Sequence, residues 1–164
     1  MLADEVNFCP RCGTPVEEAE RFGKMRAVCP ACGWIHFADP KVAVAALIER
    51  GAEVLLVRRA IDPQRGLWTL PAGFVDAGED PLEAMVRECK EETGLTVRPG
   101  ALLTVLYGQE HPRGAHIFIV YRAEISGGSP QAQDDVDALG FFDRELLPDL
   151  AFQTTRKILM LSQK

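Results

Sequence analysis

The chain has 164 residues, of which 47% are hydrophobic and 26% charged, which fits one globular domain with a small additional module. Its formal net charge of -6 argues against a general binder of nucleic acid or membranes, since such proteins usually present a basic surface. The N-terminus lacks the basic and apolar stretches of a signal peptide, and the longest apolar run, residues 42–48, is too short to span a bilayer; we therefore expect a cytoplasmic protein without membrane contact.

Four of the five cysteines lie in two matching motifs near the N-terminus. Cys9 and Cys12 form one C-x-x-C pair, Cys29 and Cys32 form the other, and a glycine follows each pair. Two such pairs can place four thiolates around one ion, a closed tetrahedral arrangement typical of structural zinc. A redox C-x-x-C occurs once, beside a βαβ pattern, and disulfides are rare in a reducing cytosol. We therefore predict a zinc ribbon with a structural Zn²⁺ over residues 1–38.

The remaining residues, 39–164, alternate between strand-like and helix-like patterns. Apolar runs separated by turn residues indicate strands, whereas apolar residues that recur every three or four positions indicate helices. This mixture predicts an α/β sandwich around a mixed sheet. Strands are expected at residues 42–49, 53–59, 68–75 (interrupted by Pro71 and Gly73), 102–109, 116–125 and 140–142, a surface turn at 127–130, and helices at 81–93 and 153–162.

The helix expected at residues 81–93 has clear start and stop signals. Asp80 is a suitable N-cap, Pro81 fits the first helical position, and Glu83 completes a capping-box-like pattern. Gly94 is placed to end the helix in the left-handed conformation. One stripe of this helix is apolar and should face the core: Leu82, Met85, Val86 and Cys89.

Three carboxylates share another face of the same helix. Glu88, Glu91 and Glu92 come together because residues three and four apart are neighbours on a helix. Such a cluster is commonly a solvated acidic surface. It also fits a hard cation, Mg²⁺ or Mn²⁺, which prefers oxygen ligands and binds phosphate oxygens as well. Bound metal would reverse the local charge, so an acidic protein could still handle phosphates.

The whole segment from Gly73 to Leu95 decides between these readings. It contains glycine, five residues, glutamate, seven residues, Arg-Glu, an apolar residue, any residue, Glu-Glu, any residue, glycine and an apolar residue. This spacing resembles the Nudix box at every fixed position, and the likeness extends from about residue 41 to the C-terminus. The cysteine module resembles the ribbon that precedes the catalytic domain in NADH-pyrophosphatase-like Nudix enzymes. The resemblance implies a Nudix α/β/α sandwich around a mixed sheet, with a small N-terminal four-cysteine zinc ribbon.

The resemblance also implies roles for the residues of the box. The reaction would be metal-dependent hydrolysis of a pyrophosphate bond. Glu88, Glu91 and Glu92 would be the metal ligands, and one of them could be the general base. Arg87 would pair with a box glutamate and hold it in place, and Glu79 would orient the ligands or bind a second metal.

Further residues are implied outside the helix. Gly73 would supply a backbone carbonyl ligand. Many family members take an additional acid from a later loop, for which Asp135 is the first choice and Glu110 the second; a solvated acidic loop is the alternative. Its neighbours Asp134 and Asp137 belong to the same acidic run.

Substrate contacts are expected from a few cationic and aromatic side chains. Arg58 and Arg59 are candidates for phosphate binding, although one of them is expected to be a surface charge. Phe74 could stack on the substrate. Trp68 is expected to fill the core.

The box specifies the reaction and leaves the substrate open. Enzymes specific for NADH carry a Ser-Gln-Pro-Trp-Pro-Phe-Pro-x-Ser run after the box, and residues 103–116 contain no such run. We therefore expect a small dinucleotide-type substrate, ADP-ribose or FAD, hydrolysed to AMP and a phosphorylated product. The alternatives are NADH, nucleoside triphosphates or capped RNA, an RNA-binding role for the ribbon, and a non-catalytic nucleotide sensor. A homodimer also stays open.

Overall fold

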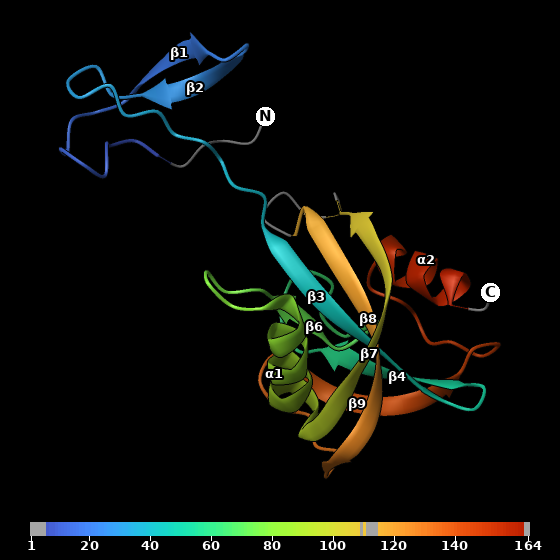
Figure 1. The fold of residues 1–164 in the computed structure, drawn as a ribbon. Helices are drawn as coiled ribbons and strands as arrows, with labels where there is room; N and C mark the ends of the chain where they lie inside the picture. The colour runs from blue at the N-terminus through green and yellow to red at the C-terminus, as the bar shows by residue number, and fades with distance from the viewer. Residues whose placement is uncertain (1–5, 109, 111–114, 163–164) are drawn as a thin grey trace. The chain divides into compact units, whose positions relative to one another are not determined.

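The computed structural model describes residues 6–108, 110 and 115–162 (Figure 1). The chain forms two compact units, Met1–Asp39 and Pro40–Lys164. Among the described residues, no helix is long and apolar enough to cross a membrane.

The first unit contains one antiparallel hairpin, formed by β1 (Glu17–Arg21) and β2 (Lys24–Val28). No strands were predicted in this region from the sequence. The two cysteine pairs lie in turns at either end of the hairpin sequence. Gly13 and Gly33 each have φ of 72°, a conformation that glycine adopts without strain, and each donates its N–H to the carbonyl of the first cysteine of its pair. The two turns therefore have the same backbone structure.

The second unit is built on a seven-stranded mixed sheet. Five strands follow the order β5-β4-β3-β8-β7, while β6 pairs with β3 and β9 pairs with β4. Strands β3 and β8 run parallel, and the other pairs are antiparallel. The elements are β3 (Val42–Arg50), β4 (Glu53–Arg59), β5 (Trp68–Thr69), β6 (Ala72–Phe74), α1 (Pro81–Thr93), β7 (Leu95–Tyr107), β8 (Ile117–Gly128), β9 (Val136–Asp143) and α2 (Gln153–Leu161).

Strand β3 shows why helices lie on both faces of the sheet. Its side chains are apolar without interruption from Val42 to Ile48, which is the pattern of a strand that is buried on both sides. Val44, Ala46 and Ile48 pack in one cluster with α1, whereas Ala45 and Leu47 pack in another cluster with α2. The predicted α/β/α sandwich around a mixed sheet is therefore confirmed, with α1 and α2 on opposite faces (Figure 1).

The pairing of β3 with β4 determines where the sheet opens. These strands pair only next to their turn, at Glu49 with Val54 and at Arg50 with Glu53. Farther from the turn, β3 pairs with β6 and β8, while β4 pairs with β5 and β9. The strands thus separate toward Ala43 of β3 and Arg59 of β4, and both of these residues line one pocket.

Several strands extend beyond their predicted bounds. Strand β7 begins at Leu95 and not at 102, because Pro99 and Gly100 are accommodated by a register shift in which β7 has one more residue than its partner β8. Strand β9 likewise begins at Val136 and not at 140. The predicted end of β7 at residue 109 and the loop residues 111–114 lie outside the described residues.

The surface turn predicted at residues 127–130 was wrong in its first half. Gly127 and Gly128 are the last residues of β8, where they pair with Thr96 and Leu95. A Cβ on Gly128 would lie 2.4 Å from the carbonyl oxygen of Gly94. The glycine is therefore required by the close approach of β8 to the end of α1, a tertiary contact that a local turn signal cannot reveal.

Candidate active site

Helix α1 places its carboxylates on a rigid element. The Asp80 side chain accepts a hydrogen bond of 2.7 Å from the backbone N–H of Leu82, and Gly94 ends the helix with φ of 68°. The apolar side of the helix is buried, with Met85 and Cys89 at 1% and 0% exposure. These caps and contacts fix the rotation of the helix about its axis, so Glu88 and Glu92 point toward β6.

Arg87 organises three of the carboxylates. Its Nε and Nη2 each donate a 2.8 Å hydrogen bond to Glu79, one to each oxygen. Its Nη1 donates to Glu88 at 2.7 Å and to Glu91 at 3.0 Å, and Nη2 also donates to the carbonyl oxygen of Phe74 at 3.0 Å. The planar guanidinium serves this role because it presents five donors in a fixed geometry. The same interaction lowers the pKa of Glu79 to about 2.

Glu92 is the most buried of the carboxylates, with 4% of its surface exposed. One oxygen accepts a 3.0 Å hydrogen bond from the backbone N–H of Ala72 on β6. Desolvation raises the pKa of Glu92 well above its usual range, and the neighbouring carboxylate of Asp135 adds to this shift. Asp135 lies in the loop before β9, so tertiary structure brings it to the helix.

Glu88 lies against the backbone of β6. A Cβ built on Gly73 would lie 1.9 Å from the Glu88 carboxyl carbon, so any other residue at position 73 would displace that side chain. The Glu88 side chain is 13% exposed, and burial raises its pKa despite the hydrogen bond from Arg87. Glu88 and Glu92 therefore lack sufficient positive charge around them, which suits the binding of a hard divalent cation.

Glu88 and Glu92 line one side of a pocket of about 500 Å³. That volume lies within the usual range for small-molecule sites. The part of the lining that comes from α1 is polar. Another part comes from β8, the start of α2 and the segment after β4, is largely apolar, and includes Ile61, Pro63, Phe118, Phe152, Thr154 and Thr155. This second part was not predicted from the sequence, because no local motif marks residues that only the fold brings together.

The acidic residues at and just before the start of β9 lie in two different environments. Asp134 and Asp135 line the pocket, and their charges act on Glu88 and Glu92 respectively. Asp137 instead accepts a 2.7 Å hydrogen bond from Nε of Arg58, which lowers the pKa of the carboxyl group. Asp137 is therefore engaged away from the box carboxylates.

Glu110, the second choice for the later acid, has a different partner. It lines the pocket, but its carboxylate accepts hydrogen bonds from the backbone N–H groups of Gln153 and Thr154, at 2.5 and 2.7 Å, and from the Thr154 hydroxyl. Helix α2 has no side-chain cap of its own. Glu110 thus satisfies the first N–H groups of α2 in place of a local N-cap residue.

Only some of the cationic and aromatic candidates for substrate contact line the pocket. Arg59 lines the pocket, where its Nε donates to the carbonyl oxygen of Pro63 at 2.7 Å. Arg58 does not line it and pairs with the carboxylate of Asp137. Phe74 lines the pocket and is 47% exposed. Trp68 packs edge-on against Phe142 at 4.6 Å between ring centroids, in the α2-side core where it was expected.

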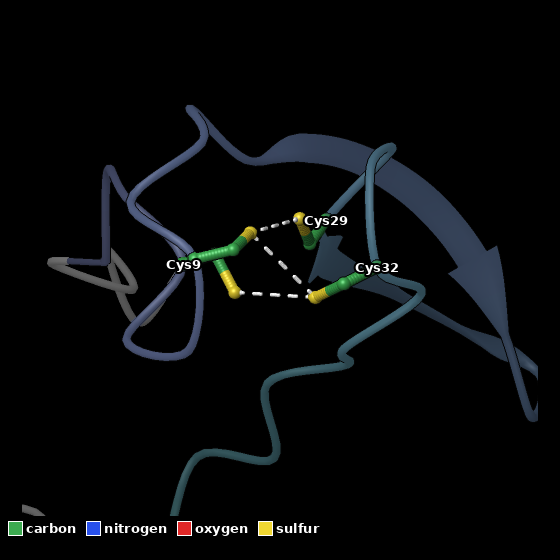
Figure 2. Close-up of side chains that lie close together, drawn as sticks. Cys9, Cys29 and Cys32 are labelled. Carbon is green, nitrogen blue, oxygen red and sulfur yellow. Dashed lines mark hydrogen bonds between the residues drawn. The ribbon is translucent and has the colours of Figure 1, made fainter.

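The four N-terminal cysteines form a separate candidate metal centre (Figure 2). Sulfur atoms lie 3.6 Å apart between Cys9 and Cys32, 3.5 Å between Cys12 and Cys29, and 3.7 Å between Cys12 and Cys32. A disulfide needs about 2.05 Å, and all five cysteines are free thiols. A tetrahedral ion with Zn–S distances of about 2.3 Å implies S–S edges of about 3.8 Å. The cluster therefore fits a four-thiolate site.

The protonation of these thiols is uneven. Hydrogen bonds with Thr14 lower the pKa of Cys12 to about 6, so this residue is readily a thiolate. A backbone hydrogen bond from Trp34 favours the thiolate of Cys32, but desolvation and the neighbouring thiols outweigh it and raise its pKa to about 12. Like charges at this spacing cannot all persist without a cation, which would release the remaining protons.

Comparisons with known proteins agree with both parts of the chain. Residues 39–161 match the family model described as NUDIX domain, and residues 7–38 match the one described as Nudix N-terminal. An ADP-ribose pyrophosphatase of Methanocaldococcus jannaschii is 44% identical over 117 residues, covering 71% of this chain and 69% of that protein. The NAD-capped RNA hydrolase NudC of Chromobacterium violaceum is 32% identical over 145 residues, covering 87% of this chain, which spans only 52% of that protein.

Solved structures extend the comparison. The crystal structure of a NUDIX hydrolase from Nitrosomonas europaea superposes with a TM-score of 0.86 at 31% identity, covering 97% of this chain and 92% of that one.

The burial of Glu92 predicts how the stability of the protein changes with pH. Its folded-state pKa is raised, so its contribution is most favourable below the unfolded pKa of about 4.3 and is lost as pH rises through the folded value. Glu92→Gln removes the ionisable group, so the protein no longer loses this stability as pH rises. The amide oxygen can still accept the hydrogen bond from the Ala72 N–H. We expect the variant to melt several degrees higher than the wild type at pH 8 in magnesium-free buffer, with the difference shrinking toward pH 4.5.

Thermal denaturation of the full chain across this pH range measures the effect. Glu83→Gln is the matched control, since Glu83 is exposed on the same helix. A lower melting temperature for Glu92→Gln than for Glu83→Gln at pH 8 would contradict the assignment of a strained buried carboxylate.

Proposed function

This chain belongs to the Nudix family of pyrophosphohydrolases, and on that premise we propose that it hydrolyses the pyrophosphate bond of a nucleoside diphosphate linked to a second moiety. ADP-ribose and FAD are the favoured substrates. Water adds to one phosphorus, the bridging P–O bond breaks, and two phosphate monoesters leave, one of them AMP.

The arrangement around Arg87 carries this proposal. One guanidinium donates to Glu79, Glu88 and Glu91, and both Arg87 and Glu88 line a pocket large enough for a small molecule. A solvated acidic surface would not need an arginine shared between three carboxylates, nor a glycine placed directly under one of them. The 44% identity to an ADP-ribose pyrophosphatase supports the choice of substrate.

The carboxylates take the following proposed roles. Glu88, Glu91 and Glu92 hold the divalent cation, together with the backbone carbonyl of Gly73. When bound, Mg²⁺ or Mn²⁺ neutralises charge on phosphate oxygens and acidifies water. Arg87 keeps the glutamates oriented and prevents their mutual repulsion from spreading them.

Residues from outside the box complete the proposed site. Asp135 is the later acid, because it contacts the buried Glu92 from a separate loop. Glu79 positions Arg87 through their two-point hydrogen bond. Of the two arginines considered for phosphate binding, Arg59 is the one that contacts the substrate, since Arg58 forms an ion pair with Asp137. Phe74 remains the candidate for stacking.

We further propose that residues 1–38 form a ribbon held by structural Zn²⁺ and that residues 39–164 form the catalytic domain. Four cysteine ligands leave no open coordination position, so this zinc would stabilise the ribbon and take no part in hydrolysis. The matching geometry of the two cysteine turns supports the ligand set.

A substrate panel tests the reaction. The full chain, with Mg²⁺ or Mn²⁺, should release AMP from ADP-ribose or FAD faster than it hydrolyses NADH, nucleoside triphosphates or NAD-capped RNA, as measured by chromatography of the products. Glu88→Gln should lower turnover by at least 100-fold, while Glu83→Gln leaves it unchanged. Turnover confined to triphosphates would overturn the substrate assignment.

A substitution at Arg87 tests its organising role. Arg87→Lys keeps the charge but cannot bond both oxygens of Glu79 and reach Glu88 and Glu91 at the same time. We expect kcat/KM to fall about 10- to 100-fold, equivalent to about 1.4–2.7 kcal/mol of transition-state stabilisation.

Arg98→Lys is the control, since Arg98 is exposed and pairs with a single carboxylate, Glu124. Equal activity in the two variants would show that the positive charge alone suffices.

Metal analysis tests the ribbon. Freshly purified protein should contain one equivalent of zinc, and Cys29→Ser should lose it because three thiolates with one hydroxyl bind zinc weakly. Cys89→Ser lies outside the cluster and should retain the metal. Zinc-free wild-type protein would refute the four-cysteine assignment, whatever its activity.

A further inference from the structure

The net charge of the chain is the sum over two units. Residues 40–164 carry 14 basic and 18 acidic side chains, and residues 1–39 carry four basic and six acidic ones. Both units are therefore acidic overall, and an anion-binding surface has to come from a local separation of charges. Three of the four basic residues of the first unit lie within its hairpin, at Arg21, Lys24 and Arg26.

The charges of the ribbon are sorted between the two faces of its hairpin. Residues that oppose each other in an antiparallel pair share a face. The register places Arg21 opposite Lys24 and Arg26 opposite Ala19, so the three cations lie on one face. The other face carries Glu18 opposite Ala27 and Glu20 opposite Met25.

The cationic face contains one carboxylate, Glu17, which pairs with Val28 at the end of the hairpin farthest from Arg21 and Lys24. Within the part of the chain that the structure describes, no carboxylate forms an ion pair with Arg21, Lys24 or Arg26. Cations left without carboxylate partners are available to an anionic ligand.

Aromatic rings lie beside these cations. The Arg26 guanidinium stacks over the Phe37 ring at 4.5 Å from its centroid, and Phe22 lies 6.0 Å from Phe37 between ring centroids. Phe22 and Phe37 remain 78% and 49% exposed. Adjacent exposed rings form an apolar patch, and apolar patches rimmed by polar residues are typical of binding surfaces.

We propose that this face of the ribbon, comprising Arg21, Phe22, Lys24, Arg26 and Phe37, binds single-stranded nucleic acid. Lysine and arginine contact the phosphates, while the rings and the stacked guanidinium provide a platform for unpaired bases. A protein partner with acidic side chains would satisfy the cations but would leave the rings without a planar group to stack on. The combination of both features favours nucleic acid.

Fluorescence anisotropy with the zinc-bound full chain in magnesium-free buffer tests this surface. The probe is a labelled oligothymidylate of twelve nucleotides, titrated between 25 and 200 mM salt. Lys24→Gln/Arg26→Gln should weaken binding at least tenfold at 50 mM salt. It should also lower the slope of log K against log salt by about 1.4, because two phosphate contacts are lost.

Arg156→Gln/Lys157→Gln is the matched control. It removes the same charge from exposed positions on α2, and its affinity should stay within twofold of the wild type. Zinc content measured on every variant shows that the ribbon is folded. An oligouridylate of the same length identifies RNA as the preferred source if it binds more tightly than the DNA probe.

The stacking contribution is measured separately with an abasic probe of equal length. Wild-type protein should prefer the base-bearing strand by about fivefold or more, and Phe37→Ala should abolish that preference. Equal loss of affinity in both charge variants, or no binding at 25 mM salt, would overturn the proposal. Competition by a twelve-residue glutamate peptide as strong as that by oligothymidylate would overturn it in favour of an acidic protein. None of these results depends on which dinucleotide the catalytic unit hydrolyses.

Discussion

Mutual repulsion between carboxylates is the constraint that shapes the catalytic unit. Glu79, Glu88 and Glu91 would separate in water, and a single guanidinium holds them within one hydrogen-bond network. Arg87 can do this because it lies on the same helix as two of them and reaches the third across a loop. The network is charge-assisted and multidentate, which makes its hydrogen bonds stronger than those of an isolated surface pair.

Packing of α1 against the sheet fixes the position of this network. Burial of Met85 and Cys89 against β3 sets the rotation of α1, and that rotation brings Glu88 onto the backbone at Gly73 and Glu92 onto the N–H of Ala72. Burial raises the pKa values of Glu88 and Glu92, which means that their ionised forms destabilise the folded state. A bound cation would offset this destabilisation. Stability and function therefore compete at the same side chains.

The two candidate metal centres differ in ligand chemistry and in openness. The first unit offers four cysteine sulfurs in a closed set beside a small hairpin, where a bound cation would replace the hydrophobic core that so short a segment cannot build. The second unit offers carboxylate oxygens in an open pocket, where substrate phosphates could complete the coordination of a cation. Soft and hard ligands would thus direct zinc and magnesium to separate places within one chain.

The sequence by itself determined the features that depend on local spacing. The caps of α1, the shared face of Glu88, Glu91 and Glu92, and the pairing of the four cysteines follow from helix periodicity and from a repeated C-x-x-C. It also predicted the sandwich, from the mixture of strand and helix patterns and from the resemblance to the Nudix family.

Only the tertiary structure decided which distant residues meet these features. Asp135 lies beside Glu92. Arg58 and Asp137 form an ion pair with each other and do not line the pocket. Glu110 accepts hydrogen bonds at the N-terminus of α2. The physical reason is that such contacts join residues far apart in the chain. Their formation depends on strand order and on the separation of β3 from β4, which no local pattern records.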